Sequence, residues 1–347
     1  MTLTSPTDRS ILTHDATGSP VPGPAGPVPR RRSLVVGLGV LRRLGAALIT
    51  LWGAATLAFF AQMALPGDRA TTIFNIRAGQ AIERTPEELA PINQAFGLQH
   101  PVLVQYLDYL GGLLRGDLGT SYQQFRPVTA IIGEQFPSTV VLGLTAILFA
   151  WILMVLWVTL TAGRPAWVRS LGAFVDTATA GLPHYWIGIL LLVVFAAGLG
   201  WFPVISADKP SGIVLPALTL AIPLAGFLGQ STRTEFESTL GQPFVTTARL
   251  RGLGDATVRL RHVLRHALLP AVTLSGWAIG ATLSGAVIVE SLYSRRGIGT
   301  VLVNAVNQQD LPVVTGIVVL VAAIYVVANL LVDALYLVLD PRLRSQA

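Results

Sequence analysis

Carboxylates that could act together in catalysis are rare in the apolar parts of this chain. Asp176 and Asp333 each stand near the end of a long apolar run, the setting in which an intramembrane protease would place paired aspartates. Single aspartates close to a membrane interface more commonly cap a helix or contact water. Nothing else supports a nucleophile or a catalytic dyad, so we expect no catalytic residue in this chain.

Two histidines stand at the spacing of a zinc site. His262 and His266 are four residues apart and would share one face of a helix. In the HExxH motif a glutamate follows the first histidine, whereas Val263 stands here, and no third ligand is nearby. We therefore assign both histidines to a basic loop and expect this chain to bind no metal and no other cofactor.

Glu290 ends the apolar run "GAVIVE". A carboxylate buried in lipid is costly, so such a residue tends to face a cavity or a partner. The alternative is that Glu290 already lies at the level of the headgroups. Both interpretations stay open.

Arginines crowd the stretch "FVTTARLRGLGDATVRLRHVLRHALLPAVT", which covers residues 244–273. Their positive charge would hold a loop on the cytoplasmic side and near anionic headgroups. The planar fork of arginine also gives directional bonds to a carboxylate or carbonyl of a partner protein. The two roles are compatible.

Long apolar segments must position these residues. The chain has 347 residues, of which 52% are hydrophobic and 12% charged, with no cysteine for disulfides or thiolate chemistry. Uncharged runs long enough to cross a bilayer predict an all-α integral membrane protein with six transmembrane helices. The runs are Leu44–Leu65, Phe136–Ala162, Thr177–Ala207, Ser211–Thr232, Ala267–Val289 and Leu311–Val332.

Basic residues predict the orientation. Most of the 24 lysines and arginines fall before the first run, in the 163–176 loop, in the 233–266 loop and at the C-terminus. The positive-inside rule therefore places both termini and the arginine-rich loop in the cytoplasm. Residues 1–33 are rich in Pro and Gly, and we expect a disordered cytoplasmic tail there, followed by the first transmembrane helix within 34–65.

Residues 66–135 are expected to form a helical segment outside the cytoplasm. Thr85 and Glu88 have the spacing of a capping box around Pro86, which predicts a helix that stops near Gly97. A second helix is expected from Pro101 to Leu114. Its apolar face, which either lies on the membrane surface or packs on the spans, consists of Leu103, Tyr106, Leu107, Leu110 and Leu114.

The chain lacks the chemistry to use ATP. No GxxxxGK[ST] phosphate loop is present, and the one lysine, Lys209, falls in a predicted external turn. We expect no enzymatic activity from this chain alone.

The arginine-rich loop resembles the loop by which permease subunits of ABC importers engage their ATPases. Thr246, Thr247 and Ala248 stand at the EAA positions of that motif and Gly252 at its glycine, with Leu-Pro further downstream than usual. The form "TAR..GL" is similar to that of dipeptide and oligopeptide permeases. "LPGD", "GWFP", "LRHALLPAVT", "GAVIVESLYSRRGIG", "QDLP" and "NLLVDALYLVLDPRLR" follow in that family's order, so the resemblance covers about residues 40–344 and fits the first permease of the pair.

The resemblance implies the type I importer permease fold, with a five-helix core in 136–347. It implies a second homologous permease, two ATPase subunits or a fused pair that bind ATP and Mg²⁺, and an extracytoplasmic binding protein, in the bacterial cytoplasmic membrane. The residues implied to couple to the ATPase are Val245, Thr246, Thr247, Ala248, Arg249, Leu250, Arg251, Gly252 and Leu253. We expect Arg249 to contact the ATPase, and Arg259, Arg261 and Arg265 to act through topology.

Trp186, Glu290 and Asn329 are the candidates for lining the passage. The implied cargo is a di- or oligopeptide. Permeases of this architecture for nickel chelates, glutathione or oligosaccharides share the same motifs and stay open as alternatives. A channel or secondary carrier without partners would favour repeated halves or paired membrane charges, and neither is evident.

Overall fold

The computed structural model describes residues 31–64, 67–80, 82–205 and 210–339, so nearly all of the expected tail at 1–33 lies outside the described residues. Within these ranges the regular structure is helical and no strand is formed. The helices are α1 Arg31–Met63, α2 Arg69–Ala78, α3 Pro86–Ala95, α4 Val102–Leu114, α5 Val128–Thr161, α6 Ala166–Gly181, α7 His184–Leu191, η1 Leu192–Gly198, η2 Pro210–Ile213, α8 Val214–Leu240, α9 Pro243–Leu250, α10 Asp255–Thr257, η3 Val258–Val263, α11 Leu264–Ala267, α12 Leu269–Leu292, α13 Ile298–Asn307 and α14 Leu311–Leu339.

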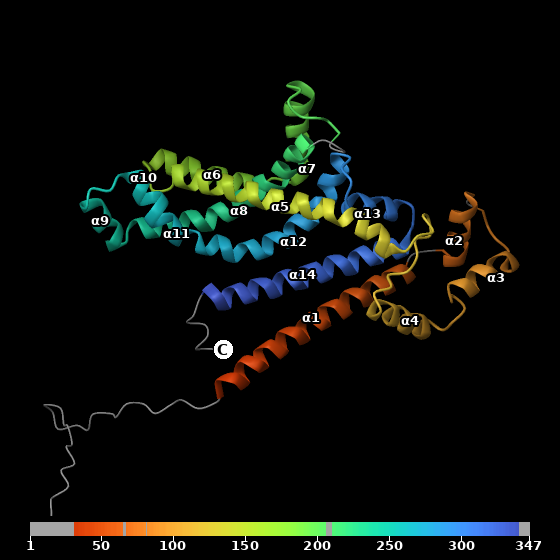
Figure 1. The fold of residues 1–347 in the computed structure, drawn as a ribbon. Coiled ribbons are helices and arrows are strands. Elements are labelled where there is room, and N and C mark those ends of the chain that lie inside the picture. The colour runs from red at the N-terminus through yellow and green to blue at the C-terminus, as the bar shows by residue number, and fades with distance from the viewer. Residues whose placement is uncertain (1–30, 65–66, 81, 206–209, 340–347) are drawn as a thin grey trace, which may run out of the picture.

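Among the described residues five helices are each long and apolar enough to cross a bilayer, and the number of spans is six when a bent pair of helices is counted as one span. The fold class predicted from the sequence is therefore confirmed. The second span begins at Val128 rather than at Phe136, because the helix continues into the less apolar stretch that precedes the uncharged run. These spans lie roughly along one another in Figure 1, with α9 at one end of the bundle and α2, α3 and α4 at the other.

The third predicted span, Thr177–Ala207, is wrong as one continuous helix. Helix α6 ends at Gly181, and the following helix, His184–Gly198, is bent from it by 103°. Pro183 has no amide hydrogen to continue the helix, and it disfavours helical backbone at Leu182, whose ψ is 131°. Hydropathy alone does not register such a break, because both halves are apolar.

Helix α8 is the centre of the bundle. It is flanked by α5, α6 and α12, and 67% of its most apolar window is buried, against 17% for α1. The largest core cluster joins α5 and α8 to the loop that carries α9, through side chains such as Met154, Leu228 and Phe236. Helices α1 and α14 run side by side along the edge of this bundle (Figure 1).

The helices expected between the first two spans are confirmed. Thr85 and Glu88 form the predicted capping box at the start of α3, and the backbone bond from Thr85 lowers the pKa of Glu88. Helix α4 contacts α1 through Tyr106, whose hydroxyl lies 2.7 Å from Thr56 Oγ1. The predicted apolar face of α4 is not buried along its whole length, because Leu114 is 90% exposed.

Small residues on α12 allow one close approach within the chain. A side chain at Gly280 would meet the ring of Tyr325 on α14 at 2.9 Å. Ser284, four residues further along α12, is exposed. Small residues recur every fourth position at Gly276, Gly280 and Ser284, and of these Gly280 packs against α14, as small residues in membrane helices can.

Candidate functional site

A short surface helix, α9, follows α8 at the end of the bundle away from α4 (Figure 1). Gln242 is extended and Pro243 occupies the first turn, where its missing amide hydrogen is not needed. The helix ends at Leu250, and Gly252 then turns the chain at a φ of 81°, a conformation that favours glycine. Of the segment Val245–Leu253 implied to couple to the ATPase, residues as far as Leu250 therefore lie in α9.

One face of α9 packs inward and the other faces out. Val245 and Ala248 are buried in the main core cluster. On the outer face Leu250 is 84% exposed. We call the exposed residues here the coupling surface, and they are Thr246, Thr247, Arg249, Leu250, Arg251, Gly252 and Leu253. An exposed leucine between two arginines provides both an apolar contact and directional donors for a partner.

The arginines of this loop differ in their surroundings. Arg249 is half exposed and lies 3.8 Å from Asp255, which also accepts a bond of 3.1 Å from Arg164 in the turn between α5 and α6. Arg251, Arg261 and Arg265 are exposed. Exposed pairs of this kind contribute little to stability, so Arg249 stays available to a partner.

Arg259 is not the exposed topology residue that we expected. Its side chain is buried, with 3% of the residue exposed, and its burial lowers the guanidinium pKa. Nε and Nη2 donate to the carbonyl oxygen of Thr159 at 3.1 and 2.6 Å, and Nη2 also donates to that of Ala162. The sequence could not indicate this, because these carbonyl partners precede Arg259 by about 100 residues.

The two histidines do not meet further ligands. His266 Nε2 accepts a bond from Arg265 Nε at 3.2 Å, and its ring contacts that of Phe244. In the described part of the chain no three His, Asp or Glu side chains cluster as metal ligands would.

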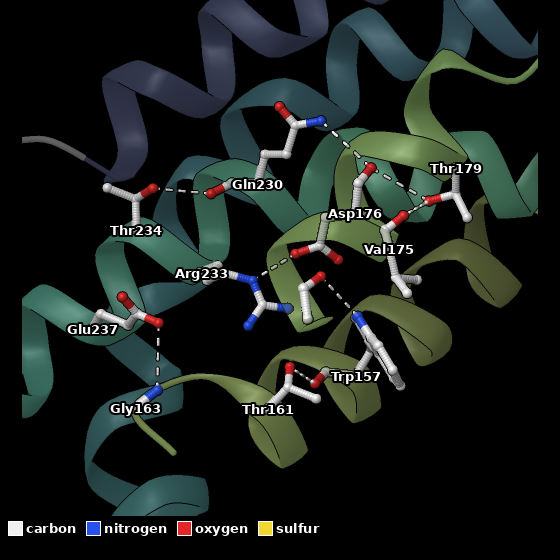
Figure 2. A network of polar contacts seen from close by, with 11 residues as sticks. Trp157, Thr161, Gly163, Val175, Asp176, Thr179, Gln230, Arg233, Thr234 and Glu237 are labelled. Carbon is white, nitrogen blue, oxygen red and sulfur yellow. Dashed lines mark hydrogen bonds and ion pairs between the residues drawn. The ribbon is translucent and has the colours of Figure 1, made fainter. Parts of the chain in front are cut away.

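Asp176 pairs with an arginine and not with a second carboxylate. Figure 2 shows Arg233 of α8 reaching Asp176 of α6, with Nε donating to Oδ2 at 2.6 Å. Both side chains are buried, at 7% and 3% exposure. The side chain of Asp333 lies outside the described residues. Because its partner is a guanidinium and not a second carboxylate, the contact fits a structural tie and offers no proton-sharing dyad.

The helices around this pair approach very closely. A side chain at Gly226 of α8 would come within 2.6 Å of the carbonyl oxygen of Asp176, and one at Gly172 of α6 within 2.7 Å of the Arg233 guanidinium. In Figure 2 Gln230, Thr179 and Trp157 add hydrogen bonds around the pair. Neither the pair nor its glycines were singled out from the sequence, since Asp176 and Arg233 are 57 positions apart.

The three candidates for the passage are not brought together. Trp186 on α7 is 61% exposed. Asn329 is also exposed, on α14, where its amide donates to the carbonyl oxygen of Tyr325 and lies beside α1. The assignment of these two residues to the passage stays a prediction.

Glu290 is completely buried and reaches no surface of the chain in this conformation. Its carboxylate accepts bonds from Thr139 Oγ1 at 2.6 Å and from the amides of Gly299 and Thr300 at 2.7 and 3.4 Å. These amides belong to the first turn of α13, which has no capping side chain of its own. Glu290 thus caps α13. Of the two interpretations left open by the sequence, the one in which Glu290 faces a partner holds, and that partner is internal.

A further carboxylate was missed by sequence reasoning. Asp310, between α13 and α14, is buried and accepts bonds from Ser121 Oγ at 2.5 Å and from the amides of Tyr122 and Gln123 at 3.0 and 3.4 Å. It fixes the end of the segment that carries α2, α3 and α4 to the turn before α14. Asp310 belongs to the motif "QDLP". Its position as a lone aspartate just before a predicted span is the feature by which the sequence could have indicated its role.

Two protein-family models match the sequence that forms these spans and this loop. The model described as "Binding-protein-dependent transport system inner membrane component" matches residues 156–345, and the model of the N-terminal part of such components matches residues 38–143. The chain belongs to this family of ABC importer permeases. It is therefore a membrane-embedded permease, and partners of its family are a further permease, an ATPase and a binding protein.

Relatives with an assigned transport function align with most of this permease. The Glutathione transport system permease protein GsiC of Salmonella typhimurium is 34% identical over 306 residues, which are 88% of this chain and 98% of that protein. The protein of the same name from Escherichia coli K12 is 32% identical over the same shares. Among solved structures, the permease is similar to a chain of an amino acid ABC transporter with histidines, with 18% identity, a TM-score of 0.44 and coverage of 62% of this chain and 94% of that one.

Proposed function

We propose that this permease, paired with a second homologous permease, forms the passage of an ATP-driven importer for glutathione or closely related small peptides. The observation that carries the cargo is the similarity to glutathione permeases over 88% of the chain. Among the cargoes left open by the sequence, these relatives favour glutathione over general di- or oligopeptides. A binding protein outside the membrane delivers the cargo, and two ATPase subunits bind ATP and Mg²⁺ on the cytoplasmic side.

The coupling surface is the site at which the ATPase acts in this proposal. Val245 and Ala248 anchor α9 in the core that also holds α5 and α8, so α9 moves as one body with those spans. Leu250, with Arg249 and Arg251 beside it, is free to enter a groove of a partner. Closure of the ATPases then displaces the spans through α9. In this proposal α9 and both termini lie in the cytoplasm.

The cargo is tested with the complete importer reconstituted in liposomes with its binding protein. We expect labelled glutathione to accumulate in an ATP-dependent way and to stimulate hydrolysis. A panel of dipeptides, a longer peptide and a nickel chelate serves as the comparison. Stimulation and uptake by dipeptides but not by glutathione would replace this cargo with the broader peptide class.

The coupling surface is tested with Leu250→Glu. A charge on Leu250, the leucine of α9, should abolish recovery of the ATPase with the permease, because an apolar contact becomes a buried, unpaired carboxylate. The matched control is Thr257→Glu, which adds the same charge to an exposed position outside α9. Equal loss of ATPase in both variants, or in neither, would argue against α9 as the docking element.

A further inference from the structure

The last turn of α5 ends in carbonyl groups that lack partners within their own helix. Helix α5 stops at Thr161, and in the last turn of any helix the carbonyl oxygens need hydrogen-bond donors from elsewhere. Arg259 supplies them, since its guanidinium donates to the carbonyl oxygens of Thr159 and Ala162. A positive group at a helix C-terminus also interacts favourably with the helix dipole.

The same guanidinium contacts α8. It lies over the ring of Phe236, with 5.0 Å from its central carbon to the ring centroid. The turn that follows α5 closes against α8 as well, because the Gly163 amide donates to Glu237 Oε1 at 3.4 Å. Gly163 has a φ of 63°, and a side chain there would collide with Leu240. The end of α5, the end of α8 and the loop therefore meet at Arg259.

Arg259 belongs to the same packed unit as α9. It lies in η3, a π-helix, and such segments recur at functional sites. Its neighbours Val258 and Val263 are buried in the core cluster that contains Val245 and Ala248 of α9. A displacement of α9 is thus passed through this cluster to Arg259 and from there to the main chain of α5.

We propose that Arg259 is a positioning residue that transmits the movement of α9 to α5 and α8, so that ATP hydrolysis is coupled to transport. This inference rests on the coupling role of α9 proposed above. A role in topology alone would need only a cation near the surface, as Arg261 and Arg265 provide. The buried planar fork, which bridges two carbonyl oxygens and stacks on a ring, fits a mechanical tie.

The first experiment compares Arg259→Gln with Arg261→Gln in the complete reconstituted importer. Glutamine is shorter than arginine, carries no charge and has two N–H donors in place of five, so it cannot both reach the two carbonyl oxygens and stack on Phe236. We expect the number of cargo molecules transported per ATP hydrolysed to fall at least about fivefold in Arg259→Gln, the lower end of usual coupling factors. Arg261→Gln, an exposed neighbour, should keep the wild-type ratio. A wild-type ratio in both variants would overturn the proposal.

The second experiment substitutes a covalent cross-link for the contact that Arg259 makes between the loop and the end of α5. Because the chain has no cysteine, Arg164→Cys with Asp255→Cys creates a single pair of thiols across the contact between the α5–α6 turn and the loop. Treatment with a flexible bismaleimide should raise the transport ratio of Arg259→Gln towards that of the same pair with Arg259 intact. If the cross-link forms and the ratio stays low, or if the complex fails to assemble even when cross-linked, Arg259 serves folding and the proposal fails.

A photo-cross-linking residue at Thr246 separates this inference from the proposed function. A cross-link from Thr246 to the ATPase, together with a normal ratio in Arg259→Gln, would reject only the role of Arg259. Absence of that cross-link in the active wild-type importer would reject α9 as the docking element, and with it the basis of the inference.

Discussion

Arg233 on α8 donates a hydrogen bond of 2.6 Å from Nε to Asp176 on α6, and both side chains are buried. Within the described part of the chain, Nη1 and Nη2 of the same guanidinium have no hydrogen-bond partner. A buried pair that is only partly satisfied depends strongly on both members. It holds α6 at the position just before the chain bends at Pro183.

Replacing one member of this pair should be more damaging than replacing both. Asp176→Asn leaves the Arg233 charge buried without its counterion, which costs about 3 kcal/mol or more. The double variant Asp176→Leu/Arg233→Met removes both charges and should recover much of that loss. Thermal unfolding of the three proteins in one detergent measures the effect. A double variant that melts no higher than Asp176→Asn would show that the two side chains are not coupled.

Glu290→Gln should weaken the start of α13 and leave the passage itself intact. The amide has one oxygen acceptor in place of two, so its NH2 group faces either the Thr139 hydroxyl or the amides of Gly299 and Thr300. Each lost bond to the carboxylate is worth roughly 1.5–3 kcal/mol. Hydrogen exchange should become faster at residues 298–300, and transport per assembled complex should stay at the wild-type level.

The matched control for Glu290→Gln is Thr139→Val. It removes the hydroxyl bond to Glu290 and the acceptor for the Ile298 amide, and keeps the carboxylate. We expect a smaller change in the same exchange rates. A transport defect in Glu290→Gln without any change in exchange would return Glu290 to the list of passage residues.

Asp310→Asn should loosen the segment between the first two spans. The carboxylate accepts three bonds from residues 121–123, and asparagine cannot reproduce them all. The loss should amount to about 2 kcal/mol, and limited proteolysis should cut residues 115–127 sooner. Asp117→Asn, which touches only the nearby Gly119 amide, is the control. Equal protection of both variants from protease would show that Asp310 is not the anchor.

Gly226→Ala should separate α6 from α8. The added carbon would lie 2.6 Å from the carbonyl oxygen of Asp176 and 2.8 Å from the Ala180 amide nitrogen, and backbone cannot yield as a flexible side chain does. We expect a loss of about 1–3 kcal/mol, the usual range for overpacking. The control Gly133→Ala on α5 meets nothing within 4 Å and should be neutral or slightly stabilising. Similar melting temperatures for both variants would contradict the close contact.

The local elements were predictable from sequence where the signal lay within a few residues. The capping box at Thr85 and Glu88, the spans and the turn at Gly252 all follow from near neighbours. Glu290 was only partly interpretable, although Gly297 and Gly299 after it are the residues that leave room for its carboxylate. A glutamate followed by two closely spaced glycines is a usable signal for such a cap.

The remaining features depend on residues that are distant in the chain. No local pattern pairs Asp176 with Arg233, or distinguishes the buried Arg259 from the exposed Arg261. Hydropathy also predicted one continuous span through the bend at Leu182 and Pro183, because it averages over side chains and ignores the missing amide hydrogen of the proline. In the proposed importer two permeases share the passage and a binding protein delivers the cargo, so the sequence of one chain indicates the cargo only through its relatives.

The bond from Arg259 to Thr159 joins residues 100 positions apart, which has a consequence for biosynthesis. When α5 leaves the ribosome, its final carbonyl groups have no donor from Arg259, because α6, α7, α8 and α9 must still be made. The nascent chain therefore completes the end of its second span only after the loop has returned to it. Chains stalled on the ribosome before and after synthesis of residue 259 would have α5 in two distinguishable states. Formation of this contact marks the stage of synthesis at which the translated spans pack into one bundle.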